Sequence, residues 1–243
     1  MTLFSVAAGS VTGQAHRLVD RDGQDGHATV ATGAVQAAIV TDGCSSGRTS
    51  EVGARIGAAW LAAIIARRFA PRMDDPREAA DATCAELAER LELLARSMSA
   101  EGDLEATTIG EALLFGFLAA VVTREHAIVF GIGDGSVLAN DEVLVIDPGP
   151  DNAPPYPAYA LLGARVPARV HFVGRAADVR VLGVATDGLV PALHLRELAW
   201  TRKLSTNPSL LGKRLRVLAR EHRFGDDATV AIVRRVEAEQ AVR

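Results

Sequence analysis

The chain has 243 residues, of which 49% are hydrophobic and 23% charged, the ordinary composition of a globular protein. A formal net charge of −4 and an isoelectric point near 5.9 argue against a nucleic-acid partner, which would require a basic face to displace counterions. Two cysteines without a Cys-x-x-Cys pair exclude a disulfide framework and a thiolate zinc site.

No segment has the pattern of a signal peptide or a membrane span. Residues Met1–Ser10 lack a basic region ahead of an apolar stretch. The apolar run Ile109–Val122 contains Glu111 and is too short to cross a bilayer. We therefore expect a cytoplasmic protein without a membrane partner.

The N-terminal part of the chain predicts two strands followed by two helices. Phe4–Val11 and Thr29–Val40 have the pattern of strands, with the polar, glycine-rich stretch Thr12–Gly26 as a loop between them. Apolar residues at helical spacing predict a helix over Ser50–Phe69, with Ser50 as its N-cap, and a second over Pro76–Met98.

The remaining part is rich in strands and ends with helices and one last strand. The predicted strands are Ile109–Thr123, His126–Ile132, Val137–Leu138, Glu142–Ile146, Arg169–Phe172, Val179–Ala185 and Thr229–Val236. Helices are expected over Pro191–Ser205 and Pro208–Arg220, and a proline-rich loop over Asp147–Pro157. Grouped strands flanked by helix pairs predict an α+β layered fold. Without a convincing boundary, we expect one domain over residues 1–243.

Aspartates stand at the ends of apolar strands in four places. The segments are Ile39-Val40-Thr41-Asp42-Gly43, Ile132-Gly133-Asp134-Gly135, Val184-Ala185-Thr186-Asp187-Gly188 and Gly225-Asp226-Asp227-Ala228-Thr229-Val230; Gly23-Gln24-Asp25-Gly26 is a fifth, in the N-terminal loop. A strand end holds a carboxylate rigidly, and an adjacent glycine lets carbonyls or waters approach. Any single Asp-Gly pair is also typical of a turn. The repeated Thr-Asp-Gly pattern favours a cleft for Mg²⁺ or Mn²⁺, which prefer oxygen ligands.

The order and spacing of these motifs resemble those of the PP2C-type (PPM) metal-dependent serine/threonine protein phosphatases. Asp42-Gly43-Cys-Ser-Ser followed by Ser50-Glu-Val-Gly53-Ala54 is similar to a bacterial branch of that family, as is Gly13-Gln-Ala-His16 ahead of Gln24-Asp25. The resemblance implies a four-layer αββα sandwich of two antiparallel sheets flanked by helix pairs, with the metal cleft at one end of the sheets.

The resemblance also implies the principal metal ligands. Asp42 would bridge two divalent cations, Mn²⁺ or Mg²⁺, and Gly43 would offer its carbonyl oxygen. Asp187 and Asp226 would complete the first ion, which makes Asp42, Asp187 and Asp226 the catalytic set. The nucleophile would be a metal-bridging hydroxide.

Asp25, directly or through water, would serve the second cation, and Asp134 a weaker third. Three residues depart from the family pattern. Gln24 stands where many relatives have Glu, Cys44 where eukaryotic members often have a His proposed as general acid, and Gly135 where Ser is usual. Cys44 does not begin a Cys-x₅-Arg phosphatase loop, because Arg48 follows too closely.

The phosphate-binding arginine of the family has no certain counterpart, and His16, Arg17 and Arg21 are the candidates. We expect hydrolysis of phosphoserine or phosphothreonine on a protein partner in bacterial signalling, such as a Ser/Thr kinase or its target. The alternative is a catalytically weak regulatory module that binds a phosphoprotein.

Arginines also recur near the C-terminal end, at Arg214, Arg216, Arg220 and Arg223. Such a stripe is typical of a solvated helix face, and the other interpretation is a contact surface for an acidic partner.

Overall fold

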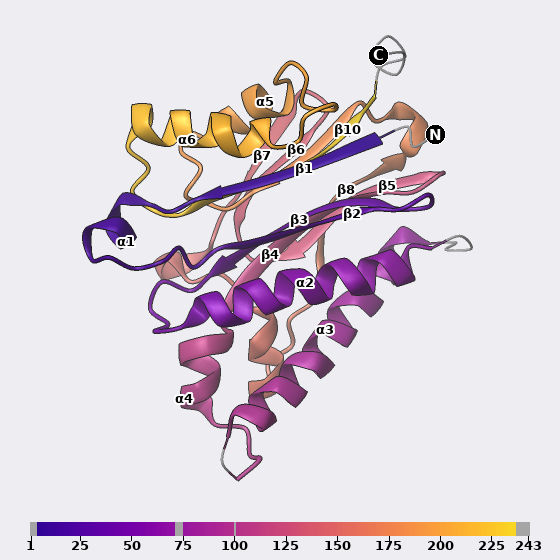
Figure 1. Cartoon of the computed structure of the whole chain (residues 1–243). Helices are drawn as coiled ribbons and strands as arrows, with labels where there is room; N and C mark the ends of the chain where they lie inside the picture. Colours follow the sequence, from indigo (N-terminus) through magenta and orange to yellow (C-terminus); the bar gives the residue numbers. More distant parts are fainter. Residues whose placement is uncertain (1–3, 71–74, 100, 237–243) are drawn as a thin grey trace.

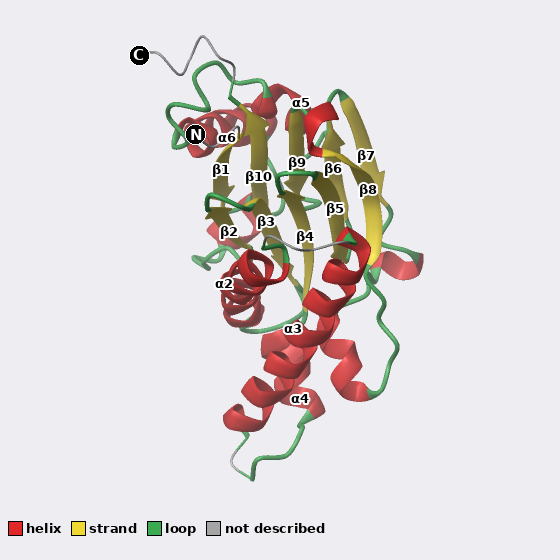
Figure 2. Ribbon diagram, turned by 90° about the vertical axis from the view of Figure 1, so that its right-hand side faces the viewer, coloured by secondary structure: helices red, strands yellow, loops and turns green. Residues whose placement is uncertain are grey.

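The computed structural model describes residues 4–70, 75–99 and 101–236. Two five-stranded sheets pack face to face, and helices cover both outer faces (Figures 1 and 2). Every neighbouring pair of strands is antiparallel. The α+β prediction and the αββα layering implied by the resemblance are confirmed.

The first sheet has the order β1-β10-β9-β6-β7 and the second β2-β3-β4-β5-β8. The strands of the first sheet are β1 (Phe4–Val11), β10 (Ala228–Arg235), β9 (Val181–Ala185), β6 (Gly135–Ala139) and β7 (Glu142–Ile146). Those of the second are β2 (Gly26–Ala31), β3 (Gln36–Gly43), β4 (Phe115–Val122), β5 (His126–Ile132) and β8 (Arg169–Arg175).

The helices α2 (Ser50–Arg68) and α3 (Pro76–Met98) cover the second sheet, and α5 (His194–Ala199) and α6 (Leu210–His222) cover the first. Shorter helical segments are α1 (Gln14–Leu18), α4 (Ala106–Thr108), the π-helix η1 (Ile109–Leu113) and the 3₁₀-helices η2 (Pro150–Asn152), η3 (Pro157–Leu162) and η4 (Ala176–Asp178). No helix of the described ranges is long and apolar enough to cross a membrane.

Three apolar cores separate the four layers. Successive side chains of a strand point to opposite faces, so β3 places Ile39 in the core beneath α2 and α3 and Val40 in the core between the sheets. The strand β4 does the same with Phe117 and Leu118. Burial on both faces explains why these two strands read as continuous apolar runs.

Two predicted strands are corrected by the structure. Residues Thr29–Val40 form two strands, because Thr32 closes a turn: its Oγ1 accepts a hydrogen bond from the backbone N–H of Val35 at 2.9 Å. The run that begins at Ile109 opens as the π-helix η1 and becomes strand only at Phe115. A short apolar run does not distinguish a buried helical turn from a strand, and here packing against α2 decides it.

Other boundaries differ by smaller amounts. The loop predicted over Thr12–Gly26 contains the short helix α1. The helix predicted over Pro191–Ser205 is shorter, at His194–Ala199, and the one predicted over Pro208–Arg220 lies two residues later, at Leu210–His222. The two long N-terminal helices, α2 and α3, have nearly the predicted bounds. Elements that carry their own periodicity were therefore predictable, whereas connections were not.

Candidate metal centre

The register of the second sheet brings three of the predicted aspartates to one end. Asp42 is the penultimate residue of β3, and Asp25 directly precedes β2, whose Gly26 pairs with Thr41. Asp134 follows β5, the strand that pairs with the far side of β4. Antiparallel pairing thus places the end of β3, the start of β2 and the end of β5 at the same edge.

The first sheet contributes the other two aspartates at the same end of the sandwich. Asp187 follows β9 and Asp226 precedes β10, and these strands pair through Ala185 and Val230. The facing sheets therefore close a cleft of about 70 Å³, lined by Asp42, Gly43, Asp134, Asp187 and Asp226 among others. Five of the six predicted metal ligands line this cleft.

Burial and mutual repulsion dominate the electrostatics of the cleft. Burial, and then the charges of Asp25, Asp187 and Asp134, hold the pKa of Asp42 well above its usual range. A hydrogen bond with Asp187 favours the protonated form of Asp42 further. Burial, the charge of Asp187 and that of Asp147 raise the pKa of Asp134 to about 6.

Asp187 and Asp25 are also perturbed. Burial raises the pKa of Asp187, and the charge of Asp226 adds to the effect. Asp25 is buried behind the cleft wall, where the Thr186 hydroxyl donates to its Oδ2 at 2.9 Å. Burial, together with the charges of Asp227 and Asp226, still holds the pKa of Asp25 well above normal.

The donor set fits divalent cations. Among the described residues, no lysine, arginine or histidine lines the cleft to neutralise its four carboxylates. Carboxylates that converge without a counter-charge must take up protons or bind cations. Oxygen ligands of this kind suit Mg²⁺ and Mn²⁺, so the residues present fit the two cations that the resemblance implied.

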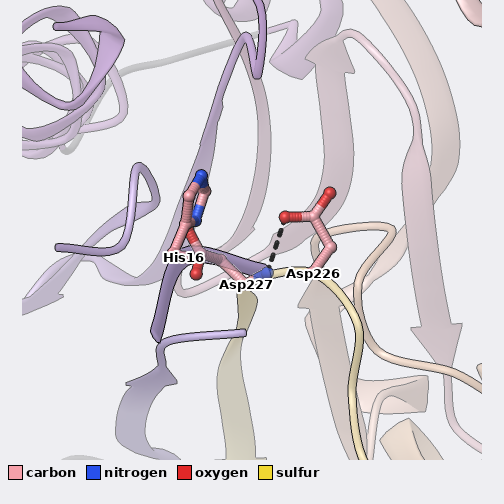
Figure 3. A group of neighbouring side chains, drawn as sticks. All are labelled: His16, Asp226 and Asp227. Atoms are coloured by element: carbon pink, nitrogen blue, oxygen red, sulfur yellow. Dashed lines mark hydrogen bonds and ion pairs between the residues drawn. The ribbon is translucent and has the colours of Figure 1, made fainter. Parts of the chain in front are cut away.

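A second acidic group, formed by His16, Asp226 and Asp227, lies beside the cleft (Figure 3). The side chain of Asp227 is 3% exposed and all its bonds go to protein donors. Its Oδ1 accepts from the backbone N–H of Gly13 at 2.7 Å, and its Oδ2 accepts from the backbone N–H of Gln24 at 2.6 Å and from His16 Nδ1 at 2.9 Å. Asp227 therefore holds both ends of the N-terminal loop together through its bonds to Gly13, His16 and Gln24, which we call the Asp227 clamp. Asp226 lines the cleft.

The residues that were candidates for phosphate binding lie elsewhere. His16 is bonded to Asp227, and the Arg17 Nε donates to the Gly13 carbonyl at 3.3 Å. The Arg21 guanidinium donates to the carbonyls of Gly47 and Arg48 at 2.9 and 2.6 Å. None of the three lines the cleft, so this arrangement favours structural roles for them.

Gln24 has a structural role of its own. It is 1% exposed, and its Nε2 donates to the Ser50 hydroxyl at 2.5 Å and to the carbonyls of Gly47 and Cys44 at 3.0 and 3.3 Å. A glutamate here would place a carboxylate oxygen against two carbonyls. The surroundings of Nε2 therefore suit an amide better than a carboxylate, while the Gln24 Oε1 is buried without a hydrogen-bond partner among the described residues.

Gly135 also matches its surroundings. It has φ +120°, in the region that L side chains rarely adopt, and a Cβ there would lie 2.3 Å from the Ala185 carbonyl oxygen. The close approach of β6 to β9 beside Asp134 thus requires glycine.

The sequence interpretation missed one wall of the cleft and the role of Asp227. Asn152, Pro154 and Tyr156, from the proline-rich loop, line the cleft opposite the aspartates. The Tyr156 hydroxyl donates to the Cys44 thiol, whose Sγ also lies 3.1 Å from the Ser46 hydroxyl. Burial opposes ionisation of Cys44, but these bonds outweigh it and lower the thiol pKa. The sequence signal for this wall was a tyrosine, Tyr156, among prolines, and the structure shows that this tyrosine is buried.

Solved structures with the same fold are bacterial phosphatases. A bacterial serine phosphatase superimposes with a TM-score of 0.65 at 13% identity, over 95% of this chain and 97% of that one. The serine/threonine phosphatase Stp1 from Staphylococcus aureus gives 0.65 at 15% identity, over 98% and 96%. The catalytic domain of the phosphatase PstP, in complex with two manganese ions, gives 0.60 at 16% identity, over 96% and 99%.

A search of curated proteins returned no match. The sequence model of protein phosphatase 2C matches residues 12–222, most of the chain. The match stops just before Asp226 and Asp227, which the structure nevertheless places beside the matched aspartates. On the strength of this match, the chain belongs to the protein phosphatase 2C family.

Proposed function

We propose that this protein hydrolyses phosphoserine and phosphothreonine on protein substrates in a reaction that depends on two divalent cations. The observation that carries the proposal is the convergence of Asp42, Asp134, Asp187 and Asp226 in one cleft without a neutralising side chain. Membership of a phosphatase family that uses two divalent metals supports the same reaction class.

Each aspartate has a proposed place around the cations. Asp42 would contact both, since it lines the cleft at the end of β3 together with Asp134 of its own sheet and Asp187 of the facing sheet. Asp187 and Asp226 would complete the first ion. Asp25, which lies behind the wall and is bonded to Thr186, would serve the second through water. Asp134 would hold a weaker third.

Two divalent cations in this cleft would supply Lewis-acid activation of a water and neutralise charge on the phosphate. The chain itself supplies positioning. The strands β3, β9 and β10 fix the three principal carboxylates, and the Asp227 clamp fixes the loop that carries Asp25. The Gly43 carbonyl is the remaining protein ligand that we propose.

The test is hydrolysis of para-nitrophenyl phosphate and of a phosphothreonine peptide with added Mn²⁺ or Mg²⁺. Activity should require the metal and fall by at least about a hundredfold in Asp42→Asn and Asp187→Asn, the size of loss typical of removing one electrostatic stabiliser. The matched control is Asp151→Asn, an exposed aspartate of the neighbouring loop that does not line the cleft.

A wild-type protein that binds Mn²⁺ but hydrolyses neither substrate would overturn the proposal. The weak regulatory module would then be the better description.

A further inference from the structure

A groove of about 390 Å³ lies between α1 and the C-terminal end of α6. Figure 1 shows these helices at the same end of the sandwich, although about two hundred residues separate them in the chain. Arg17 comes from α1, and Arg220 and Arg223 come from α6 and the residue after it. Leu18, which is 76% exposed, adds apolar surface between them, and the buried Ala219 lies beneath.

The charge of this groove is not neutralised. Within the described parts of the chain, Arg220 and Arg223 form no ion pair, and Arg17 bonds only to a carbonyl of its own turn. No acidic side chain lines the groove. The exposed Lys213 and Arg216 continue the row along α6, at spacings that share one helix face. The whole protein has a net charge of −4, so this basic surface is confined to one region of it.

The backbone of Arg223 is left-handed. It ends α6 with φ +51° and ψ 57°, the left-handed conformation in which glycine is the usual residue. A side chain at such a position costs roughly 1 kcal/mol relative to glycine. Arg223 lines the groove, so its replacement by glycine removes the charge and suits the backbone at the same time.

The groove and the metal centre are close along the chain. The backbone N–H groups of Gln14 and Ala15 donate to the carbonyls of Phe224 and Gly225, both at 2.9 Å. Arg223 lines the groove and Asp226 lines the cleft. Three residues apart in the chain, their Cα atoms are separated by at most about 11 Å. An extended peptide covers that distance with three to four residues.

We propose that this groove binds an acidic segment of the phosphoprotein substrate, a few residues from the phosphorylated side chain. The inference rests on the proposed function and specifies its substrate class. Arginine guanidinium groups match carboxylates with two parallel hydrogen bonds, and the exposed leucine offers contact to the peptide stem. Nucleic acid is disfavoured, because an extended phosphate backbone requires a broader basic face than this acidic protein provides.

The experiment compares phosphothreonine peptides that carry three glutamates, three to six residues before or after the phosphothreonine, with their glutamine counterparts. The wild type should show a higher kcat/KM for a glutamate peptide, and this preference should shrink as salt is raised. In R220Q/R223G it should fall about three- to tenfold, the effect of two exposed ion pairs. Glycine at position 223 relieves the left-handed strain, so misfolding does not explain a loss.

The matched control is Arg214→Gln, an exposed arginine of α6 outside the groove, which should keep the preference. Equal kcat/KM for glutamate and glutamine peptides in the wild type would overturn the inference, as would an unchanged preference in R220Q/R223G. Displacement of the peptide by a short oligonucleotide more readily than by the glutamate peptide would also overturn it.

Failure of the groove and failure of the proposed function remain distinguishable. Activity on para-nitrophenyl phosphate without a preference for acidic peptides refutes only the groove. Inertness refutes the proposed function, and binding of fluorescently labelled peptides, measured by anisotropy, then still tests the groove.

Discussion

Replacement of the adjacent residues Asp226 and Asp227 by asparagine should have different effects on the stability of the metal-free protein. In Asp227→Asn, the amide nitrogen that replaces one carboxylate oxygen must face an N–H donor, either that of Gly13 or those of Gln24 and His16. At least one charge-assisted bond is lost, which costs about 1.5–3 kcal/mol, and a buried donor is left unpaired. We expect a loss of at least about 2 kcal/mol, or a fall in Tm of about 4–8 °C for a chain of this size.

Asp226→Asn should behave in the reverse manner. Asp226 is exposed, and its one bond in the structure, accepted from the backbone N–H of Asp227 at 2.7 Å, can also be made by an asparagine oxygen. Its stability in EDTA should match that of the wild type, while stabilisation by Mn²⁺ and phosphatase activity should be lost.

Urea unfolding in EDTA, followed by thermal unfolding with and without Mn²⁺, separates the two variants. Asp227→Asn should lose stability without metal and respond weakly to Mn²⁺, since the loop that carries Asp25 is released. If Asp227→Asn unfolds at the wild-type urea concentration, the clamp does not hold the loop and the reasoning is refuted.

Three further predictions concern Gln24 beside the Asp227 clamp and two residues that line the cleft, Asp134 and Cys44. Gln24→Glu should lower the Tm in EDTA by more than the uncharged Gln24→Met, because a carboxylate would face the carbonyls of Gly47 and Cys44; equal shifts would contradict this. Mn²⁺ should raise the Tm more at pH 7.5 than at pH 5.5, as differential scanning fluorimetry can show. The pKa of Asp134 is raised to about 6, so the folded apo protein holds a proton that the unfolded chain releases near pH 4. The stabilisation from this proton is lost as pH rises through 6, where the cation can replace the proton. An equal rise in Tm at both pH values would count against this reasoning. Cys44→Ser should keep most of the activity towards para-nitrophenyl phosphate, because serine retains the bonds to Ser46 and Tyr156; a loss as large as that of a metal-ligand variant would show that the thiol is required.

The sequence was informative wherever a local pattern determines the structure. The helix α3 carries its own amphipathic periodicity, and the aspartates at 42, 134, 187 and 226 could be located because each ends or begins an apolar run. Their convergence did not follow from the runs alone. It came from the resemblance, and the antiparallel register of β2–β3, β4–β5 and β9–β10 is its physical cause.

The features that could not be predicted depend on contacts between distant residues. The bond between Gly13 and Asp227 joins positions 214 residues apart, so nothing near Asp227 in the chain distinguishes it from Asp226. The wall that contains Tyr156 belongs to a loop without periodicity, whose position is set by packing and by the bond to Cys44. The turn at Thr32 depends on one side-chain hydrogen bond within an apolar run.

What distinguishes the structural carboxylate of Asp227 from the proposed metal ligand Asp42 is the supply of hydrogen-bond donors. Asp227 is as buried as any acidic side chain of the site, yet three N–H donors from the N-terminal loop use both of its oxygens, so a cation would have to displace them. Asp42 lies among further carboxylates, whose charges, together with burial, hold its pKa well above the usual range. The same fold thus occupies the oxygens of Asp227 with protein N–H donors and leaves those of Asp42 to the cation that we propose. Because the first holds the loop beside the second, a cation entering the cleft meets ligands whose positions are already fixed, and little of its binding energy is spent on ordering them.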